Sequence, residues 1–137
     1  AIQYVVETVE HQRTQQKSLR VRIPGAVRPQ EIVVLGGHFD SINGSFFGDK
    51  SAPGADDNAS GSSSLIEALR VISGGNQPER TIEFMWYAAE EVGLWGSGEI
   101  AASYKSAAKD VIGVLQLDMT MHPGDGELTI ASMSDFT

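Results

Sequence analysis

The chain has 137 residues, with 10 Lys and Arg against 18 Asp and Glu, a formal net charge of −8 and no cysteine. This length suits one domain, the acidic balance argues against nucleic acid or an anionic membrane as a partner, and the lack of thiols excludes disulfides and thiolate zinc sites. No apolar run approaches the roughly 20 residues that cross a bilayer, so we expect a soluble protein whose metal ligands, if any, are His, Asp or Glu.

The first thirty residues predict a β-hairpin. Residues 19–23 alternate between apolar and charged side chains with a period of two, which is typical of a half-exposed strand. Residues 2–8 are the expected antiparallel partner, joined through the polar stretch 11–16. His11 lies in this stretch, and we expect it to be solvated.

After residue 30 the pattern alternates between strands and helices. Strands are expected at residues 32–35, 81–87, 111–117 and 128–131, the first and third of them buried. Helices are expected at residues 60–73, where Gly74 and Gly75 follow as C-cap residues, and at residues 97–109. This order indicates an α/β fold with parallel strands, preceded by the hairpin.

Ionisable side chains follow each of the three main strands of this α/β region. They are His38 and Asp40 after the first, Glu90 and Glu91 after the second and Asp118 after the third, with Asp56 and Asp57 before the first helix. In open α/β sheets ligands bind beyond the carboxyl ends of the strands, so these groups are expected at one edge. A bound cation would relieve the repulsion among the carboxylates. Histidine with carboxylates suits zinc, with cobalt or manganese as substitutes, whereas calcium or magnesium favours an all-oxygen shell.

Each of these residues also has a purely structural interpretation. The alternatives are a hydrogen-bonding role for His38, a solvated loop for Glu90 and Glu91, helix capping by Asp56 and Asp57, and a turn at Asp118. The functional interpretation is favoured because all of these groups fall at the same predicted sheet edge.

Four motifs stand in order along the chain: GGHFDS at residues 36–41, PGADDNASG at 53–61, YAAEEVGLWGS at 87–97 and QLDM at 116–119. Together they resemble the secreted bacterial leucyl aminopeptidases with two co-catalytic zinc ions, which are zinc exopeptidases. The resemblance implies a three-layer αβα sandwich around a mixed, largely parallel sheet, here incomplete. Residues 1–137 would then be a partial catalytic domain, with a hairpin at 1–30 and a metal-bearing α/β core at 31–137.

Carried over to these motifs, the resemblance implies four metal ligands. His38 and Asp118 would hold one zinc ion, Asp57 would bridge both ions, and Glu91 would bind the other. Glu90 would be the general base acting on a metal-bridging water. The implied function is a zinc-dependent aminopeptidase that hydrolyses the N-terminal residue of peptides, preferably an apolar, leucine-like one, in a secreted or periplasmic protein.

Three further features accompany this resemblance. Asp40 lies two residues from His38 on the same side of an extended chain, so its carboxylate is expected to accept the second imidazole N–H. The resemblance also implies a cis peptide bond between Asp57 and Asn58. Met119 would line the pocket for the substrate's first side chain.

The family's fifth ligand, a histidine from the C-terminal part of a longer chain, is absent from these motifs. His122 lies near the expected edge, so a role as substitute ligand stays an alternative, but Pro123 and Gly124 beside it favour an ordinary turn. A complete site would bind two Zn²⁺ ions. For the portion of the site present here, binding of one ion or of none stays open. Besides peptide substrates, the expected partners are a missing C-terminal portion or a second copy at an exposed sheet edge.

Two alternative functions stay open. One is another zinc exopeptidase-group enzyme, either a carboxypeptidase or a glutaminyl cyclase. The other is a non-catalytic module that binds metal or a partner.

Overall fold

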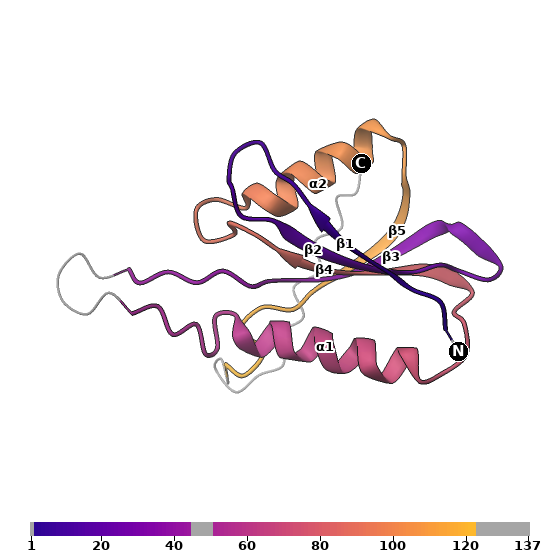
Figure 1. Ribbon diagram of the computed structural model, residues 1–137, viewed down its shortest axis with the longest axis horizontal. Coiled ribbons are helices and arrows are strands. Elements are labelled where there is room, and N and C mark those ends of the chain that lie inside the picture. The colour runs from indigo at the N-terminus through magenta and orange to yellow at the C-terminus, as the bar shows by residue number, and fades with distance from the viewer. Residues whose placement is uncertain (1, 45–50, 123–137) are drawn as a thin grey trace.

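The computed structural model describes residues 2–44 and 51–122, which form a five-stranded mixed sheet between two helices. The strands are β1 (Val5–Val9), β2 (Ser18–Ile23), β3 (Arg28–His38), β4 (Arg80–Tyr87) and β5 (Asp110–Gln116), and the helices are α1 (Ala59–Ser73) and α2 (Trp95–Ser106). The sheet order is β1-β2-β4-β3-β5, and α1 and α2 cover opposite faces (Figure 1). The expected αβα sandwich is confirmed, and the strand expected at 128–131 lies outside the described residues.

The hairpin is part of the same sheet as the parallel strands. β1 pairs antiparallel with β2, β2 pairs antiparallel with β4, and β4, β3 and β5 run parallel. The charged face of β2 is turned toward α2: Arg20 donates to the Tyr104 hydroxyl at 2.8 Å, and the Nη1 atom of Arg22 lies 3.4 Å from Oε1 of the fully buried Glu83. That face of the strand is therefore covered by a hydrogen-bonding hydroxyl and a buried carboxylate.

Helix α1 lies where its apolar spacing predicts, and it packs on one face of the sheet. Leu65 is fully buried against Phe84 and Trp86 of β4, and burial of one such side chain contributes about 1.5–3 kcal/mol to stability. The N-cap is Asn58, whose side chain accepts the N–H of Gly61, and the helix ends at the cap residue Gly74. The alternative of capping by Asp56 and Asp57 is therefore wrong.

Strand β5 is an exposed edge strand, so the expectation that it is buried is wrong. Among the described residues it pairs with β3 alone, and Ile112, Val114 and Leu115 are 48%, 44% and 54% exposed. Burial of a parallel strand needs neighbouring strands at both edges and cover on both faces. Within the described part of the chain, β5 has a neighbouring strand at one edge.

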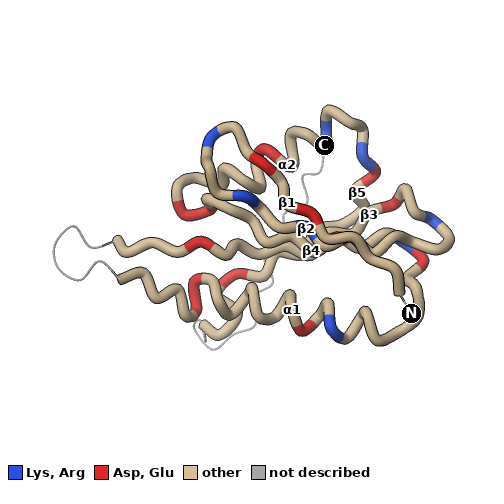
Figure 2. Tube along the Cα trace, viewed as in Figure 1, with Lys and Arg blue, Asp and Glu red and all other residues tan. Residues whose placement is uncertain are grey.

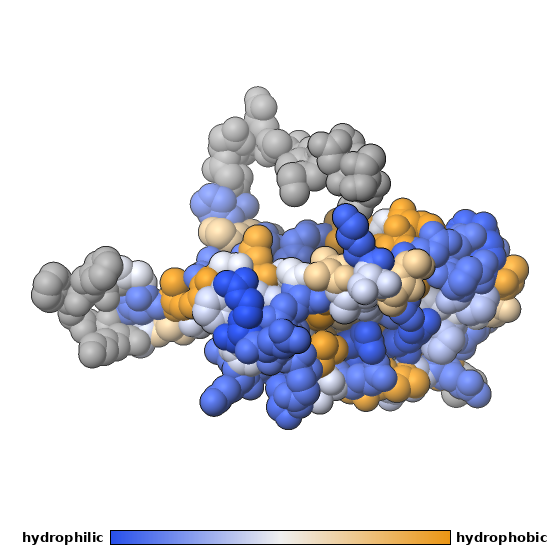
Figure 3. Space-filling view, turned by 90° about the horizontal axis from the view of Figure 1, so that it is seen from above, coloured by the Kyte–Doolittle hydropathy of each residue, from blue (hydrophilic) through white to orange (hydrophobic). Residues whose placement is uncertain are grey.

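The outer surface of the sandwich is mixed in character. Seen from the α2 side, apolar residues form separate patches among hydrophilic ones (Figure 3). No helix in the described ranges is both long enough and apolar enough to cross a membrane.

Candidate active site

The parallel register of the sheet brings the predicted site residues to one end. His38 is the last residue of β3 and pairs with Tyr87 of β4, so Glu90 and Glu91 follow at the same end. On the other side Gly36 pairs with Gln116, which places Asp118, two residues further on, level with His38. Asp and Glu residues gather at this end, on the loops that follow β3 and β4 and precede α1 (Figure 2).

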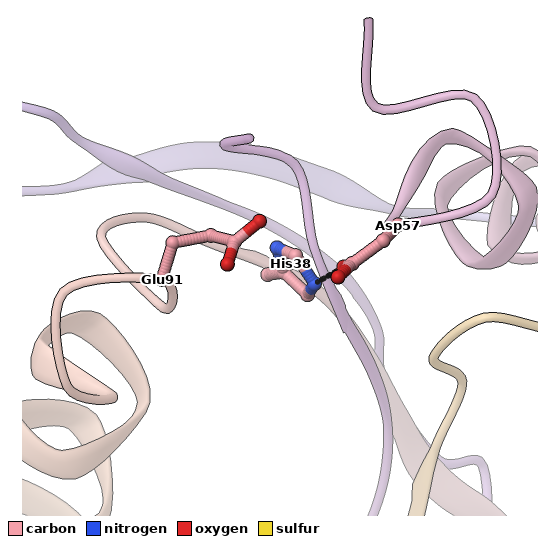
Figure 4. Close-up of side chains that lie close together, drawn as sticks. All are labelled: His38, Asp57 and Glu91. Carbon is pink, nitrogen blue, oxygen red and sulfur yellow. Dashed lines mark ion pairs between the residues drawn. The ribbon is translucent and has the colours of Figure 1, made fainter. Parts of the chain in front are cut away.

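The His38 imidazole is the centre of this group. Its side chain is fully buried, and its Nε2 atom lies 2.9 Å from Oδ1 of Asp57, 3.4 Å from Oδ1 of Asp118 and 3.9 Å from Oε2 of Glu90. The Asp57 contact is an ion pair by distance but lies outside hydrogen-bond direction, so within the described residues this Nε2 atom has no hydrogen-bond partner. The ring stands between Asp57 and Glu91, and ligand atoms of these three residues lie within 4.8 Å of one another (Figure 4).

The electrostatics of the group favour a bound cation. Burial of His38 opposes its protonation, but the charges of Asp118 and Glu90 prevail and raise its pKa. Burial also raises the pKa of Glu90, against the influence of His38 and with the help of the neighbouring carboxylates. A metal ion would occupy the unsatisfied Nε2 position and neutralise these charges, and one imidazole with several carboxylates is a donor set that fits zinc.

Asp40 contacts the imidazole through its backbone, which differs from the expectation. The Nδ1 atom of His38 is 3.0 Å from the Asp40 carbonyl oxygen and 3.6 Å from its carboxylate. Because β3 ends at His38, the chain at Asp40 no longer follows the strand, and its carboxylate is turned toward the loop after β4. There it accepts the backbone N–H groups of Glu90 at 3.1 Å and Glu91 at 3.2 Å, so Asp40 orients both parts of the site.

Asn58 is a buried polar hub that sequence reasoning missed. Its side chain is 2% exposed, and its amide donates to the carbonyl oxygens of His38 at 3.3 Å and Leu117 at 3.0 Å. Its Oδ1 atom accepts the N–H groups of Gly61 at 3.1 Å and Met119 at 3.2 Å. Asn58 therefore ties the ends of β3 and β5 to the start of α1, and its place between Asp57 and the helix was the available signal.

The remaining expectations concern Asn58, Met119 and two histidines. The peptide bond between Asp57 and Asn58 is cis, as expected. Met119 is 40% exposed beside Asp118, and its role in a substrate pocket stays a prediction. The N–H of His122 donates to the Met119 carbonyl at 3.0 Å, as in a turn. The expectation that His11 is solvated is wrong, because its side chain is 1% exposed and its Nε2 atom lies 2.7 Å from the Ser18 hydroxyl.

Comparison with known proteins identifies related sequences. The family model described as peptidase family M28 matches residues 19–136. A probable leucine aminopeptidase from Arthroderma otae is 47% identical over 119 residues, which are 83% of this chain and 32% of the relative. The chain thus spans about a third of the length of the curated relative it matches.

Solved structures show the same similarity. LapA from Legionella pneumophila superposes with a TM-score of 0.74 at 36% identity, over 85% of this chain and 31% of LapA. A zinc aminopeptidase from Bacillus subtilis gives a TM-score of 0.62 at 29% identity, over 76% of this chain and 24% of that enzyme. A glutaminyl cyclase from an Acidobacteriales bacterium superposes with a TM-score of 0.53, over 86% of this chain and 43% of the cyclase. Its sequence is only 16% identical, so it shows a shared fold alone.

Proposed function

The chain belongs to peptidase family M28, and on that premise we propose that it carries the catalytic edge of a zinc-dependent aminopeptidase. The observation that supports this most directly is the buried Nε2 atom of His38. It has no hydrogen-bond partner among the described residues, yet carboxylate oxygens from three separate loops surround it. An atom in that position is suited to bind a cation.

Four residues of the chain would hold the metal. We assign His38, Asp57, Glu91 and Asp118 as ligands of two zinc ions in the complete protein, with Asp57 shared between them. The printed description of the Bacillus subtilis relative as a zinc aminopeptidase supports the choice of zinc. When bound, zinc would polarise the scissile carbonyl and make a water molecule more acidic.

Glu90 is the proposed general base. Its carboxylate reaches to 3.9 Å from His38 Nε2, while its backbone N–H is fixed by Asp40. A carboxylate so close to the ligands, but outside their number, is placed to accept a proton from the attacking water and to return it to the leaving amine. Positioned proton transfer of this kind contributes about 10²–10⁴-fold to rate.

The charges around the site favour an amino end over a carboxyl end as the group recognised. The described loops that carry the site residues, 39–44, 51–58, 88–94 and 117–122, contain no Lys or Arg. The hairpin turn at the same end carries two cations, but Arg13 lies against the Trp95 ring and Lys17 pairs with Glu10. A carboxypeptidase needs a cationic group to hold the substrate's terminal carboxylate, whereas an acidic cluster attracts the ammonium group of a free N-terminus. The same loops expose apolar side chains, Phe39, Val92, Leu94 and Met119, which suits an apolar first residue of the substrate.

The test is the dependence of hydrolysis on the two ends of the substrate. Zinc-loaded full-length protein should release p-nitroaniline from leucine p-nitroanilide but not from its N-acetyl derivative, and should cleave a leucyl peptide equally well with a free or an amidated C-terminus. A requirement for the free carboxyl end would identify a carboxypeptidase. Cyclisation of N-terminal glutamine without peptide hydrolysis would identify a glutaminyl cyclase, and zinc binding without turnover a non-catalytic module.

Two further expectations are kept as proposals. Export to the periplasm or the cell exterior rests on the resemblance and is tested by fractionation of the source cells. Pairing of β5 with a further part of a longer chain or with a second copy is supported by its exposed apolar residues, and gel filtration of the full-length protein tests self-association.

A further inference from the structure

The segment that carries Glu90 and Glu91 is held from two sides. Asp40 accepts the N–H groups of these two residues, as described above. The two preceding N–H groups also have side-chain acceptors: that of Ala88 donates to Ser18 Oγ at 3.0 Å, and that of Ala89 donates to Gln16 Oε1 at 3.1 Å. Both acceptors belong to the hairpin, which matches the resemblance least. Four consecutive N–H groups, at residues 88–91, are therefore fixed by side chains.

Ser18 is itself oriented by a histidine and an acid. Its hydroxyl lies 2.7 Å from Nε2 of His11, and Nδ1 of His11 lies 3.4 Å from Oε2 of Glu99 in α2. This order of groups is that of a serine-hydrolase triad, but Ser18 is fully buried and its oxygen already accepts the Ala88 N–H. A nucleophile must reach its substrate, so this geometry serves positioning rather than attack.

The hairpin turn is anchored to the start of α2 by independent contacts. Glu99 accepts the N–H groups of Gln12 at 2.8 Å and Arg13 at 3.1 Å. The guanidinium of Arg13 lies 4.6 Å from the ring centroid of Trp95, the first residue of α2. The turn thus lies beside the loop from β4 to α2 (Figure 1).

We infer that His11, Gln16, Ser18 and Glu99, here called the hairpin brace, are positioning residues that hold the backbone at Ala88 and Ala89 and thereby place Glu90 and Glu91. Catalytic groups work only when held within about 0.5 Å of their productive position by surrounding contacts. Displacement at Ala88 or Ala89 passes directly along the chain to Glu90. The catalytic consequence rests on the proposed function, whereas the effect on backbone order rests on these contacts alone.

Amide hydrogen exchange in the full-length protein tests the backbone part. Ser18→Ala should speed exchange of the Ala88 amide by about tenfold or more, because its buried N–H loses its acceptor. Gln16→Ala should do the same at Ala89, and Gln16→Glu, which keeps an acceptor oxygen, should restore protection. Gln16 is exposed, so its variants remain folded and carry the test if Ser18→Ala does not fold.

Thr81→Val is the matched control. Thr81 is also fully buried in the sheet, accepts the Gly25 N–H at 3.1 Å and donates to the Pro29 carbonyl at 2.8 Å, at the opposite end of β4. The Thr81→Val variant should be less stable than the wild-type protein, but its amide hydrogen exchange at residues 88–91 should be unchanged. Equal acceleration there in Ser18→Ala and Thr81→Val would show general loosening and overturn the inference, as would unchanged exchange in both Ser18→Ala and Gln16→Ala.

Zinc affinity and turnover provide the second readout. Ser18→Ala should weaken Zn²⁺ binding, measured by competition with a chelator, and lower kcat/KM, each by about tenfold, since supporting contacts of metal ligands have effects of this size. Thr81→Val should leave both unchanged. Altered exchange with wild-type zinc affinity would overturn the link to the site. Altered exchange and zinc affinity in a protein without aminopeptidase activity would uphold the inference and refute the proposed function.

Discussion

Replacement of Asn58 by alanine should be among the most damaging single changes outside the metal ligands. The side chain joins the ends of β3 and β5 to the start of α1 through four hydrogen bonds, all to backbone groups. It is 2% exposed. Its removal leaves the Leu117 carbonyl and the N–H groups of Gly61 and Met119 without this partner, whereas the His38 carbonyl still accepts the Ser62 hydroxyl at 2.9 Å.

The size of the effect follows from the number of bonds lost. One intramolecular hydrogen bond contributes about 0.5–1.5 kcal/mol net, and a buried group left unpaired costs about 1–3 kcal/mol. The contact with the His38 carbonyl is long, at 3.3 Å, and water can replace part of what is lost. We expect Asn58→Ala to lower the free energy of unfolding by about 3–5 kcal/mol, a loss that marks a broken buried network.

Chemical denaturation of the metal-free full-length protein measures this loss. Asn76→Ala is the matched control, because Asn76 is exposed after α1 and its replacement should change stability by no more than about 0.5 kcal/mol. A loss below about 1 kcal/mol for Asn58→Ala, or a loss equal to that of the control, would refute the role of Asn58 as a hub.

Three other predictions concern packing, pH and metal. Gly61→Ala should lower stability by about 1–3 kcal/mol, because the added methyl would collide with the Leu117 carbonyl. Gly98→Ala, within α2, should raise stability by about 0.5–1 kcal/mol, because its methyl would point into open space. Denaturation curves that move in the same direction for both variants would contradict this. Burial raises the pKa of both Tyr87 and Tyr104 to about 12. Since an unfolded tyrosine ionises near pH 10, unfolding releases protons between about pH 10 and 12 and stability should fall across that range. An absorbance titration of the folded protein in which both residues ionise with a midpoint near pH 10 would disprove it. Free Zn²⁺ at a hundredfold excess over its Kd should raise the free energy of unfolding by about 2.7 kcal/mol and a chelator should reverse this, whereas stability indifferent to zinc would argue against the site.

The elements of the α/β region could be predicted because each carries its own periodicity. Their ends were less predictable. Helix α2 begins at Trp95, two residues before the expected start, after Leu94 in the left-handed region with no side-chain cap to mark it. It ends at Ser106, three residues before the expected end, and the left-handed residue that follows is Ala108 rather than a Gly that would mark the end in the sequence.

Burial of individual residues depends on tertiary contacts that local patterns do not contain. His11 looked solvated because its neighbours in sequence are polar, yet α2 and β2 enclose it. The apolar run of β5 looked buried, but among the described residues only β3 pairs with it. The site residues could be expected at one sheet edge from topology, whereas the hydrogen bonds of Asn58 and the turn of the Asp40 carboxylate toward Glu90 needed coordinates.

The replacement of Glu90 by glutamine in the zinc-loaded full-length protein tests the central claim most directly. The variant keeps the shape of the side chain and leaves the four proposed ligands in place, so zinc content measured on the same sample should be unchanged. Hydrolysis of leucine p-nitroanilide should fall by about 10²–10⁴-fold, while Glu79→Gln, an exposed site at the other end of β4, should keep the wild-type rate. A wild-type rate in Glu90→Gln with full zinc content would contradict the account.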